Sequence, residues 1–140
     1  MSSDIYDKPS IGAALARRVI DAAVAEASTT DTAFTIALVD ESGVLKAFHR
    51  MDGAPLLSVQ IAQDKAYTAA GFGISTDAWH DFIKDDAPLA DGATAAIDRL
   101  VVFGGGYPIV VDGHTVGGIG VSGGHYSDDM RIAQAGIAGI

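Results

Sequence analysis

Five side chains of this chain are chemically suited to hold an acidic small molecule and to move protons on it. Arg50 can clamp a carboxylate through two parallel hydrogen bonds. Lys65 can act as a second cation or, when it is desolvated, as a base or an amine nucleophile. Asp52, Asp129 and His125 belong to the residue types that take up and release protons. The pattern predicts that Arg50 and Lys65 bind an anionic ligand and that the other three are candidate catalytic residues.

Each of these residues also has a purely structural interpretation. Asp52 stands two residues after Arg50 at the end of an expected strand, where it can bend the chain into the next helix. Lys65 borders the apolar face of an expected helix and can extend its ammonium group into water. Asp129 falls at the start of another expected helix, whose free N–H groups stabilise a carboxylate. His125 can be an ordinary surface histidine, a proton carrier or a metal ligand.

Many of the chain's 17 glycines fall between residues 103 and 126, among β-branched and aromatic residues. Such a stretch can form a hairpin whose bare backbone lets a ligand, or another chain, approach closely. The backbone N–H groups around Gly105 can cradle a carboxylate, and Tyr107 can form a wall for a flat ligand. Ser122 and Tyr126 place hydroxyl groups at the strand-to-helix junction. We therefore predict that these four residues contact the ligand.

The composition excludes several classes of function. The formal net charge of −9 argues against a nucleic acid or an anionic membrane as partner. The absence of cysteine rules out disulfides and thiolate metal sites, and no two histidines have the spacing of a helical metal site. No apolar run is long enough to cross a membrane, and the polar N-terminus does not resemble a signal peptide. We expect a cytoplasmic protein that takes a small anionic ligand and has no metal-ion site of its own.

Hydrophobic periodicity predicts the elements that position these residues. Hairpins imply an antiparallel sheet, and amphipathic helices must cover its apolar faces. We predict one α+β domain over residues 1–140, with an α-β-α arrangement in which a five-stranded antiparallel sheet is flanked by helices, as in profilin-like or sensor domains. The expected helices are 11–27, 57–72, 77–84 and 128–139, the expected strands are 34–39, 44–51, 100–103, 107–111 and 114–122, and the acidic segment 85–98 is expected to be mostly loop.

Four short motifs carry a resemblance to a known family. Residues 50–54 (RMDGA), 65–69 (KAYTA), 104–109 (GGGYPI) and 117–124 (GGIGVSGG), the last followed by Asp129, resemble the GlcG/HbpS heme-binding-like family. That family also supplies the C-terminal domain of PduO-type corrinoid adenosyltransferases. The resemblance implies an α-β-α fold with a five-stranded sheet, homo-oligomeric assembly, and heme as a cofactor of some members. It favours a site role for Lys65 and Asp129 over their structural interpretations. If the ligand is heme, His125 is the best candidate for an axial ligand.

Three functions are compatible with these residues. The favoured hypothesis is a homo-oligomeric binding protein whose pocket near the glycine-rich hairpin takes heme or another acidic ligand. The alternative is a small catabolic enzyme, an isomerase, hydratase or hydrolase, that performs acid–base chemistry on a carboxylate-bearing metabolite. The third is an accessory subunit of another enzyme. Fold alone does not decide between them, because one fold serves many functions.

Overall fold

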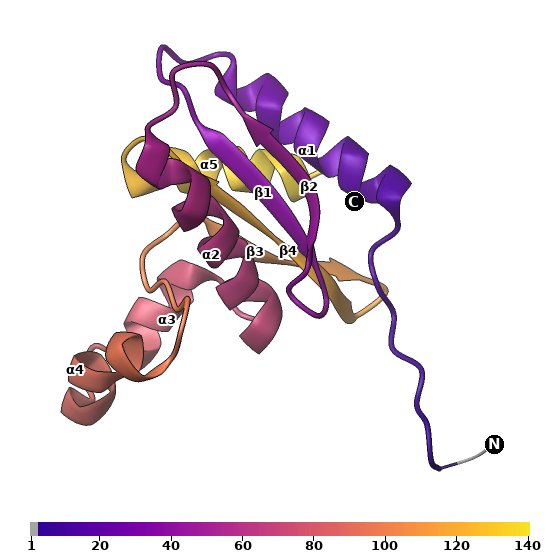
Figure 1. Cartoon of the computed structure of the whole chain (residues 1–140), viewed down its shortest axis with the longest axis vertical. Helices are drawn as coiled ribbons and strands as arrows, with labels where there is room; N and C mark the ends of the chain where they lie inside the picture. The colour runs from indigo at the N-terminus through magenta and orange to yellow at the C-terminus, as the bar shows by residue number, and fades with distance from the viewer. Residues whose placement is uncertain (1–2) are drawn as a thin grey trace.

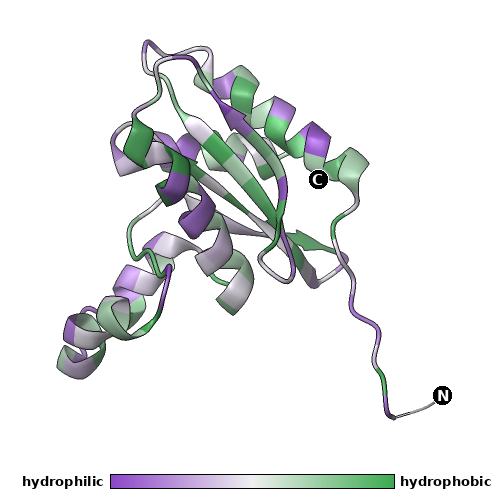
Figure 2. Cartoon of the chain, viewed as in Figure 1, coloured by the Kyte–Doolittle hydropathy of each residue, from purple (hydrophilic) through white to green (hydrophobic). Residues whose placement is uncertain are grey.

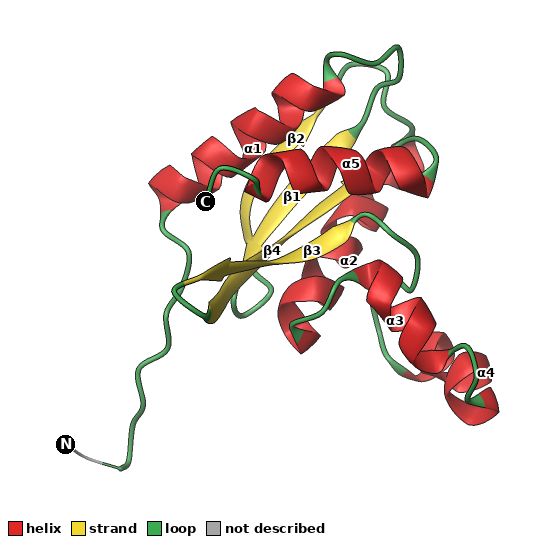
Figure 3. Ribbon diagram, turned by 180° about the vertical axis from the view of Figure 1, so that it is seen from behind, coloured by secondary structure: helices red, strands yellow, loops and turns green. Residues whose placement is uncertain are grey.

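The computed structural model of the chain describes residues 3–140. One antiparallel sheet of four strands, in the order β2-β1-β4-β3, lies between two layers of helices. Helices α1 and α5 lie side by side on one face, and α2 covers the other (Figures 1 and 3). The elements are α1 (Ala13–Ala27), β1 (Thr35–Asp40), β2 (Leu45–Arg50), α2 (Leu56–Phe72), α3 (Thr76–Ile83), α4 (Ala87–Ala96), β3 (Gly106–Val111), β4 (His114–Ser122) and α5 (Tyr126–Ile137). The predicted α-β-α arrangement with an antiparallel sheet is therefore confirmed.

The glycines of β4 explain how closely α2 approaches the sheet. Gly118 and Gly120 point toward α2, and a Cβ atom on either would meet the backbone carbonyl of Ala66 or Ala62. Buried alanines on the facing side of the helix complete this small-residue contact. The glycine-rich stretch thus serves helix packing along β4, one of the uses that the sequence left open.

The opposite face of the sheet carries the larger side chains. Phe34, Ile36, Ile119 and Ile132 are fully buried there, in a core shared by the sheet, α1 and α5. The central strand β1 is accordingly mostly hydrophobic along its length, whereas the edge strand β2 carries hydrophilic residues and the helices alternate between hydrophobic and hydrophilic faces (Figure 2). None of the helices between residues 3 and 140 has the length and apolar character that a bilayer crossing requires.

The predicted fifth strand, residues 100–103, is wrong. Its backbone is held by a side chain of α2 instead of by a neighbouring strand: the hydroxyl of Thr68 donates to the carbonyl of Arg99 (3.0 Å) and accepts from the N–H of Val101 (3.1 Å). Arg99 itself has a positive φ of 63°, which turns the chain just before the segment. An apolar run bounded by polar residues resembles a strand in sequence, but here it packs against helices.

This Thr68 clamp gives a first testable prediction. Thr68→Val removes the hydroxyl and leaves a buried N–H and a carbonyl without a partner, so the free energy of unfolding should fall by about 1–3 kcal/mol. Chemical denaturation measures the change. Thr94→Val, at an exposed position of α4, is the matched control and should change stability by only about 0.5 kcal/mol. Equal stability of the two variants would contradict the role of the clamp.

The prediction of a loop over residues 85–98 is also wrong, because α4 occupies most of that segment. Asp86 caps the helix by accepting from the N–H of Leu89 (3.3 Å), and Pro88 stands in its first turn. Together α3 and α4 extend away from the sheet (Figure 1) and bury only a small cluster around Trp79, Ile83 and Ala93. The Asp112-Gly113 turn that joins β3 to β4 is confirmed, since both residues have positive φ angles as a tight hairpin requires.

Candidate functional site

A buried ion pair lies at the end of the sheet where β4 leads into α5. Lys65 of α2 and Asp129 of α5 come from opposite sides of the sheet and meet there, with 2.9 Å between Nζ and Oδ2. The Lys65 side chain is fully buried, and that of Asp129 is 3% exposed. The ammonium also donates to the backbone carbonyl of Val121 at 2.8 Å. The pair therefore ties the two helical layers together at the tip of β4.

Gly105 makes room for this pair. It has a φ of 127°, and a Cβ atom on it would lie 2.6 Å from Nζ of Lys65 and 2.9 Å from Cβ of Asp129. No other residue type fits both the backbone angle and the space. The second oxygen of Asp129 accepts from the backbone N–H of Gly124 (3.4 Å). Three of the residues that sequence reasoning selected, Lys65, Gly105 and Asp129, are thus in mutual contact.

Burial sets the electrostatics of the pair. Desolvation lowers the pKa of Lys65 below its usual value and raises the pKa of Asp129 above its own, and the attraction between the two charges opposes both shifts. The ionised pair gains its mutual attraction and loses the hydration of both charges. Lys65 therefore acts as one member of an enclosed ion pair, and its protonation depends on that of Asp129, which is not so for a solvated lysine.

A hollow of about 280 Å³ adjoins the pair, and we call it the Phe103 hollow. Its walls include two half-exposed aromatic residues, Phe103 and Tyr126, and Gly104. Helix α3 contributes His80 and two carboxylates, Asp77 and Asp81. The hollow therefore combines flat apolar walls, one imidazole and two acids. Its volume lies just below the roughly 300–1,000 Å³ of typical small-molecule pockets.

His125 has a structural duty that the sequence did not indicate. It is the N-cap of α5, and its Nδ1 accepts from the backbone N–H of Ser127 (3.2 Å). Its ring also lies 4.2 Å, centroid to centroid, from the ring of Tyr126. The hydroxyl of Ser127 also lies 2.8 Å from Nδ1, so this nitrogen is engaged by the first turn of α5.

Arg50 and Asp52 lie apart from the buried pair. Arg50 ends the edge strand β2, whereas residues 103–105 lead into β3, the edge strand on the other side of the sheet. Thr35 of β1 pairs with both Arg50 and Ser122, so the two backbones are separated by two strand spacings, about 10 Å. The guanidinium donates to the carbonyl of Ala54 from Nη2 (2.7 Å) and Nε (3.2 Å), and Asp52 lies exposed in the turn that follows.

Ser122 and Tyr107 border the site from two sides. Ser122 is buried and, by strand alternation, shares the α2 face of the sheet with Gly118 and Gly120. Tyr107 packs against the core on the other face, and its hydroxyl is buried without a hydrogen-bond partner among residues 3–140. Burial, helped by the charge of Asp77, raises the pKa of Tyr107 to about 12. Its hydroxyl therefore stays protonated at neutral pH.

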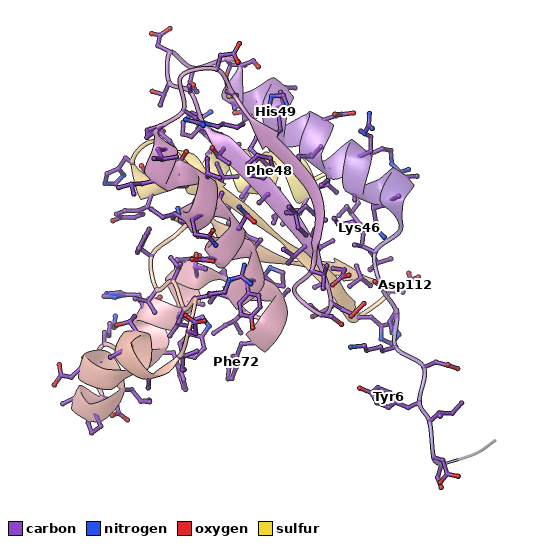
Figure 4. All side chains as sticks on the ribbon, viewed as in Figure 1. Tyr6, Lys46, Phe48, His49, Phe72 and Asp112 are labelled. Atoms are coloured by element: carbon purple, nitrogen blue, oxygen red, sulfur yellow. The ribbon has the colours of Figure 1, made fainter. Side chains whose placement is uncertain are left out.

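Sequence reasoning missed a second hollow, of about 310 Å³, at the far end of α2. We call it the Tyr67 hollow: Tyr67, Phe72 and Trp79 form its apolar walls, and Glu41 and Asp98 stand at its rim. Phe72 projects from the end of the helix, away from the sheet (Figure 4), and is 60% exposed. Helical periodicity gave no signal for it, because Tyr67 and Phe72 are five residues apart and so lie about 140° from each other around the helix.

Nitrogen and carboxylate ligands do not gather into a metal centre. Within the described part of the chain, residues 3–140, no three His, Asp or Glu side chains lie close enough together to hold a metal ion. The arrangement around the Phe103 hollow is instead suited to a flat organic ligand. The described chain is thus a three-layer α-β-α domain with a buried cation–carboxylate pair beside an aromatic hollow.

Comparison with known proteins identifies the family. The chain belongs to the HbpS-like family, described as "Haem degrading protein HbpS-like", whose model matches residues 11–138. It is 36% identical over 119 residues to the corrinoid adenosyltransferase PduO of Salmonella typhimurium, a match that covers 85% of this chain but 35% of PduO. The chain therefore spans about a third of that relative.

Solved structures agree in fold. The crystal structure of a PduOC–heme complex superposes with a TM-score of 0.86 at 33% sequence identity, over 94% of this chain and 95% of the other. The crystal structure of HbpS gives a TM-score of 0.88 at 27% identity, over 100% of this chain and 96% of the other. The family resemblance predicted from the four sequence motifs is thus confirmed.

Proposed function

We propose that this chain is a heme-binding protein that takes a flat, acidic tetrapyrrole in the Phe103 hollow and acts as a homo-oligomer. The observation that carries the proposal is the close structural likeness to the PduOC–heme complex, joined to an aromatic hollow that offers an imidazole. Heme iron in proteins is commonly held by a histidine nitrogen, and the ring faces are covered by apolar side chains.

The residues around the hollow fit this group. Phe103 is 48% exposed and Tyr126 is 51% exposed, so each presents a ring surface that a flat ligand can cover. His80 lies in the lining, and His125, the candidate chosen from the sequence, is committed to its helix cap. We therefore propose His80 as the protein's ligand to iron. The Tyr67 hollow is less suited, because none of its described lining residues carries an imidazole that could hold iron.

The size of the hollow supports the oligomer. About 280 Å³ can enclose part of a tetrapyrrole, so the exposed remainder would face a second copy of the chain. Apolar side chains elsewhere on the surface are available for contact: Leu56 and Leu57, at the start of α2, are 75% and 76% exposed. Light scattering of the protein with and without hemin tests whether it is an oligomer.

The proposal predicts the outcome of a hemin titration. Hemin added to the purified protein should produce a saturable Soret band, and His80→Ala should weaken its affinity by about tenfold or more because the iron loses its protein ligand. His114→Ala, an exposed histidine at the β3–β4 turn, is the matched control and should bind as the wild type does. Absence of a saturable band would refute the proposed function. A band unchanged in the His80 variant would refute the assignment of the ligand.

The alternative of an acid–base enzyme finds no specific support from the geometry. Of its three candidate proton carriers, Asp52 is exposed on the other side of β4 from Asp129, Asp129 is sealed in the ion pair, and His125 caps α5. We therefore keep the binding function as the proposal.

A further inference from the structure

The ammonium group of Lys65 has a third donor that faces an aromatic ring. Two of its N–H groups are used by the carbonyl of Val121 and the carboxylate of Asp129. On a third side the ring of Phe103 lies 5.0 Å from Nζ, measured to the ring centroid. This distance falls within the range of a cation–π contact. Nζ therefore makes two hydrogen bonds to oxygen atoms, and its third contact is the weaker one with the ring of Phe103.

Phe103 separates this ammonium from the hollow. One side of the residue meets Nζ, while the side chain also lines the Phe103 hollow and remains 48% exposed. Phe103 belongs to neither a helix nor a strand, and it is followed by Gly104, Gly105 and Gly106. A residue with half of its surface in water and glycines next to it can change its side-chain position at low cost.

The ligand proposed for the hollow needs a cation that its lining does not supply. Among the described lining residues the charged groups are Asp77 and Asp81, which repel a carboxylate, and His80 is the one basic group. Lys84 forms an exposed pair with Asp81 (3.5 Å) and so neutralises part of that charge. Lys65, directly behind the Phe103 ring, is the cation placed to receive an acidic group from this direction.

We propose that Phe103 is a movable cover over Lys65, and that when the ring swings aside Lys65 donates a hydrogen bond to a carboxylate of the ligand bound in the Phe103 hollow. The proposal rests on the proposed function for its ligand, a flat molecule with carboxylate groups. The hydrogen bond from Lys65 to the ligand replaces the cation–π contact, while the bonds to Val121 and Asp129 remain. Phe103 then lies free to cover one face of the ligand.

The cover is tested first by the chemical reactivity of Lys65, a measurement that needs no ligand. Acetic anhydride labelling followed by peptide mass spectrometry should modify Lys65 slowly in the wild type and about tenfold faster or more in Phe103→Ala, because opening no longer requires the ring to move. The exposed Lys46 serves as the internal standard in every sample. Phe82→Ala, which removes another half-exposed ring, is the matched control and should leave Lys65 labelling unchanged.

The carboxylate subsite is tested by comparing hemin with hemin dimethyl ester, in which both carboxylates are blocked. Hemin should bind the wild type more tightly than the ester does, and hemin alone should protect Lys65 from labelling. Phe103→Leu, which lacks the ring that lies over Nζ, provides a second variant if Phe103→Ala does not fold, and it should label Lys65 faster than the wild type and more slowly than Phe103→Ala.

The outcomes separate the two proposals. Equal Lys65 labelling in the wild type and both folded Phe103 variants would overturn the cover. Equal affinity for hemin and its ester, without protection of Lys65, would overturn the carboxylate subsite. Failure of hemin to bind at all, with labelling accelerated as expected, would refute the proposed function while the cover itself stood.

Discussion

Gly120→Ala should be among the most damaging single substitutions in this chain, lowering the free energy of unfolding by about 3 kcal/mol or more. A Cβ atom at this position would overlap the carbonyl oxygen of Ala62 and lie 2.6 Å from the N of Ala66. Both partners are helix backbone, which cannot turn aside as a flexible side chain can. To accept one methyl group, α2 would have to lift from the sheet along its length.

The matched control is Gly92→Ala. Gly92 lies inside α4, and a Cβ atom there meets nothing within 4 Å. Alanine favours a helix over glycine, so this variant should be more stable than the wild type by about 0.5–1 kcal/mol. Urea denaturation of the two variants beside the wild type gives both changes. If Gly120→Ala unfolded at the wild-type midpoint, the close contact between β4 and α2 described above would be incorrect.

The same contact shows what the sequence could and could not predict about the fold. Helical periodicity located α1, α2 and α5, and the Asp112-Gly113 turn located the β3–β4 hairpin, because these signals are local. The segment at 100–103 has the apolar character of a strand, and its exclusion from the sheet depends on the distant hydroxyl of Thr68. Helix α4 lacks a clear apolar stripe, although its capping Asp86 and following Pro88 were visible signals.

The site residues were likewise only partly predictable from the sequence. Lys65, Gly105 and Asp129 come together because α2, the β3 approach and the start of α5 all reach one end of the sheet. Arg50 was grouped with them because its guanidinium can bind a carboxylate, but strand order places it on the far edge of the sheet. Such order is set by pairing between distant segments, which a single sequence does not display. The N-cap role of His125 was missed because histidine is not among the usual capping residues.

Asp129→Ala should destabilise the protein by about 3–5 kcal/mol, because it leaves the buried ammonium of Lys65 without its counter-charge. Lys65→Met should have an effect of similar size, since it leaves the carboxylate of Asp129 buried and unpaired. Lys65→Met combined with Asp129→Leu removes both charges at once. The double variant should recover about 2 kcal/mol or more relative to the less stable single variant, because neither charge is then left alone.

The pH dependence of this pair provides an independent check, and its sign follows from the two pKa shifts. The pKa of Asp129 is raised by burial, so its contribution to stability is fully present below the ordinary value of 3.8 and is lost as the pH rises through the folded-state pKa. The pKa of Lys65 is lowered by burial, so its contribution is present above 10.5 and is lost as the pH falls through the folded-state pKa. The free energy of unfolding of the wild type, relative to that of the double variant, should therefore be lowest near neutral pH.

Equilibrium unfolding of the wild type and the double variant across the pH range measures this difference directly. The free energy of unfolding of the wild type minus that of the double variant should pass through a minimum in the neutral region and rise toward both acid and alkaline pH. A maximum there would mean that the attraction between Lys65 and Asp129 exceeds the cost of removing both charges from water. The ion pair would then be a net source of stability.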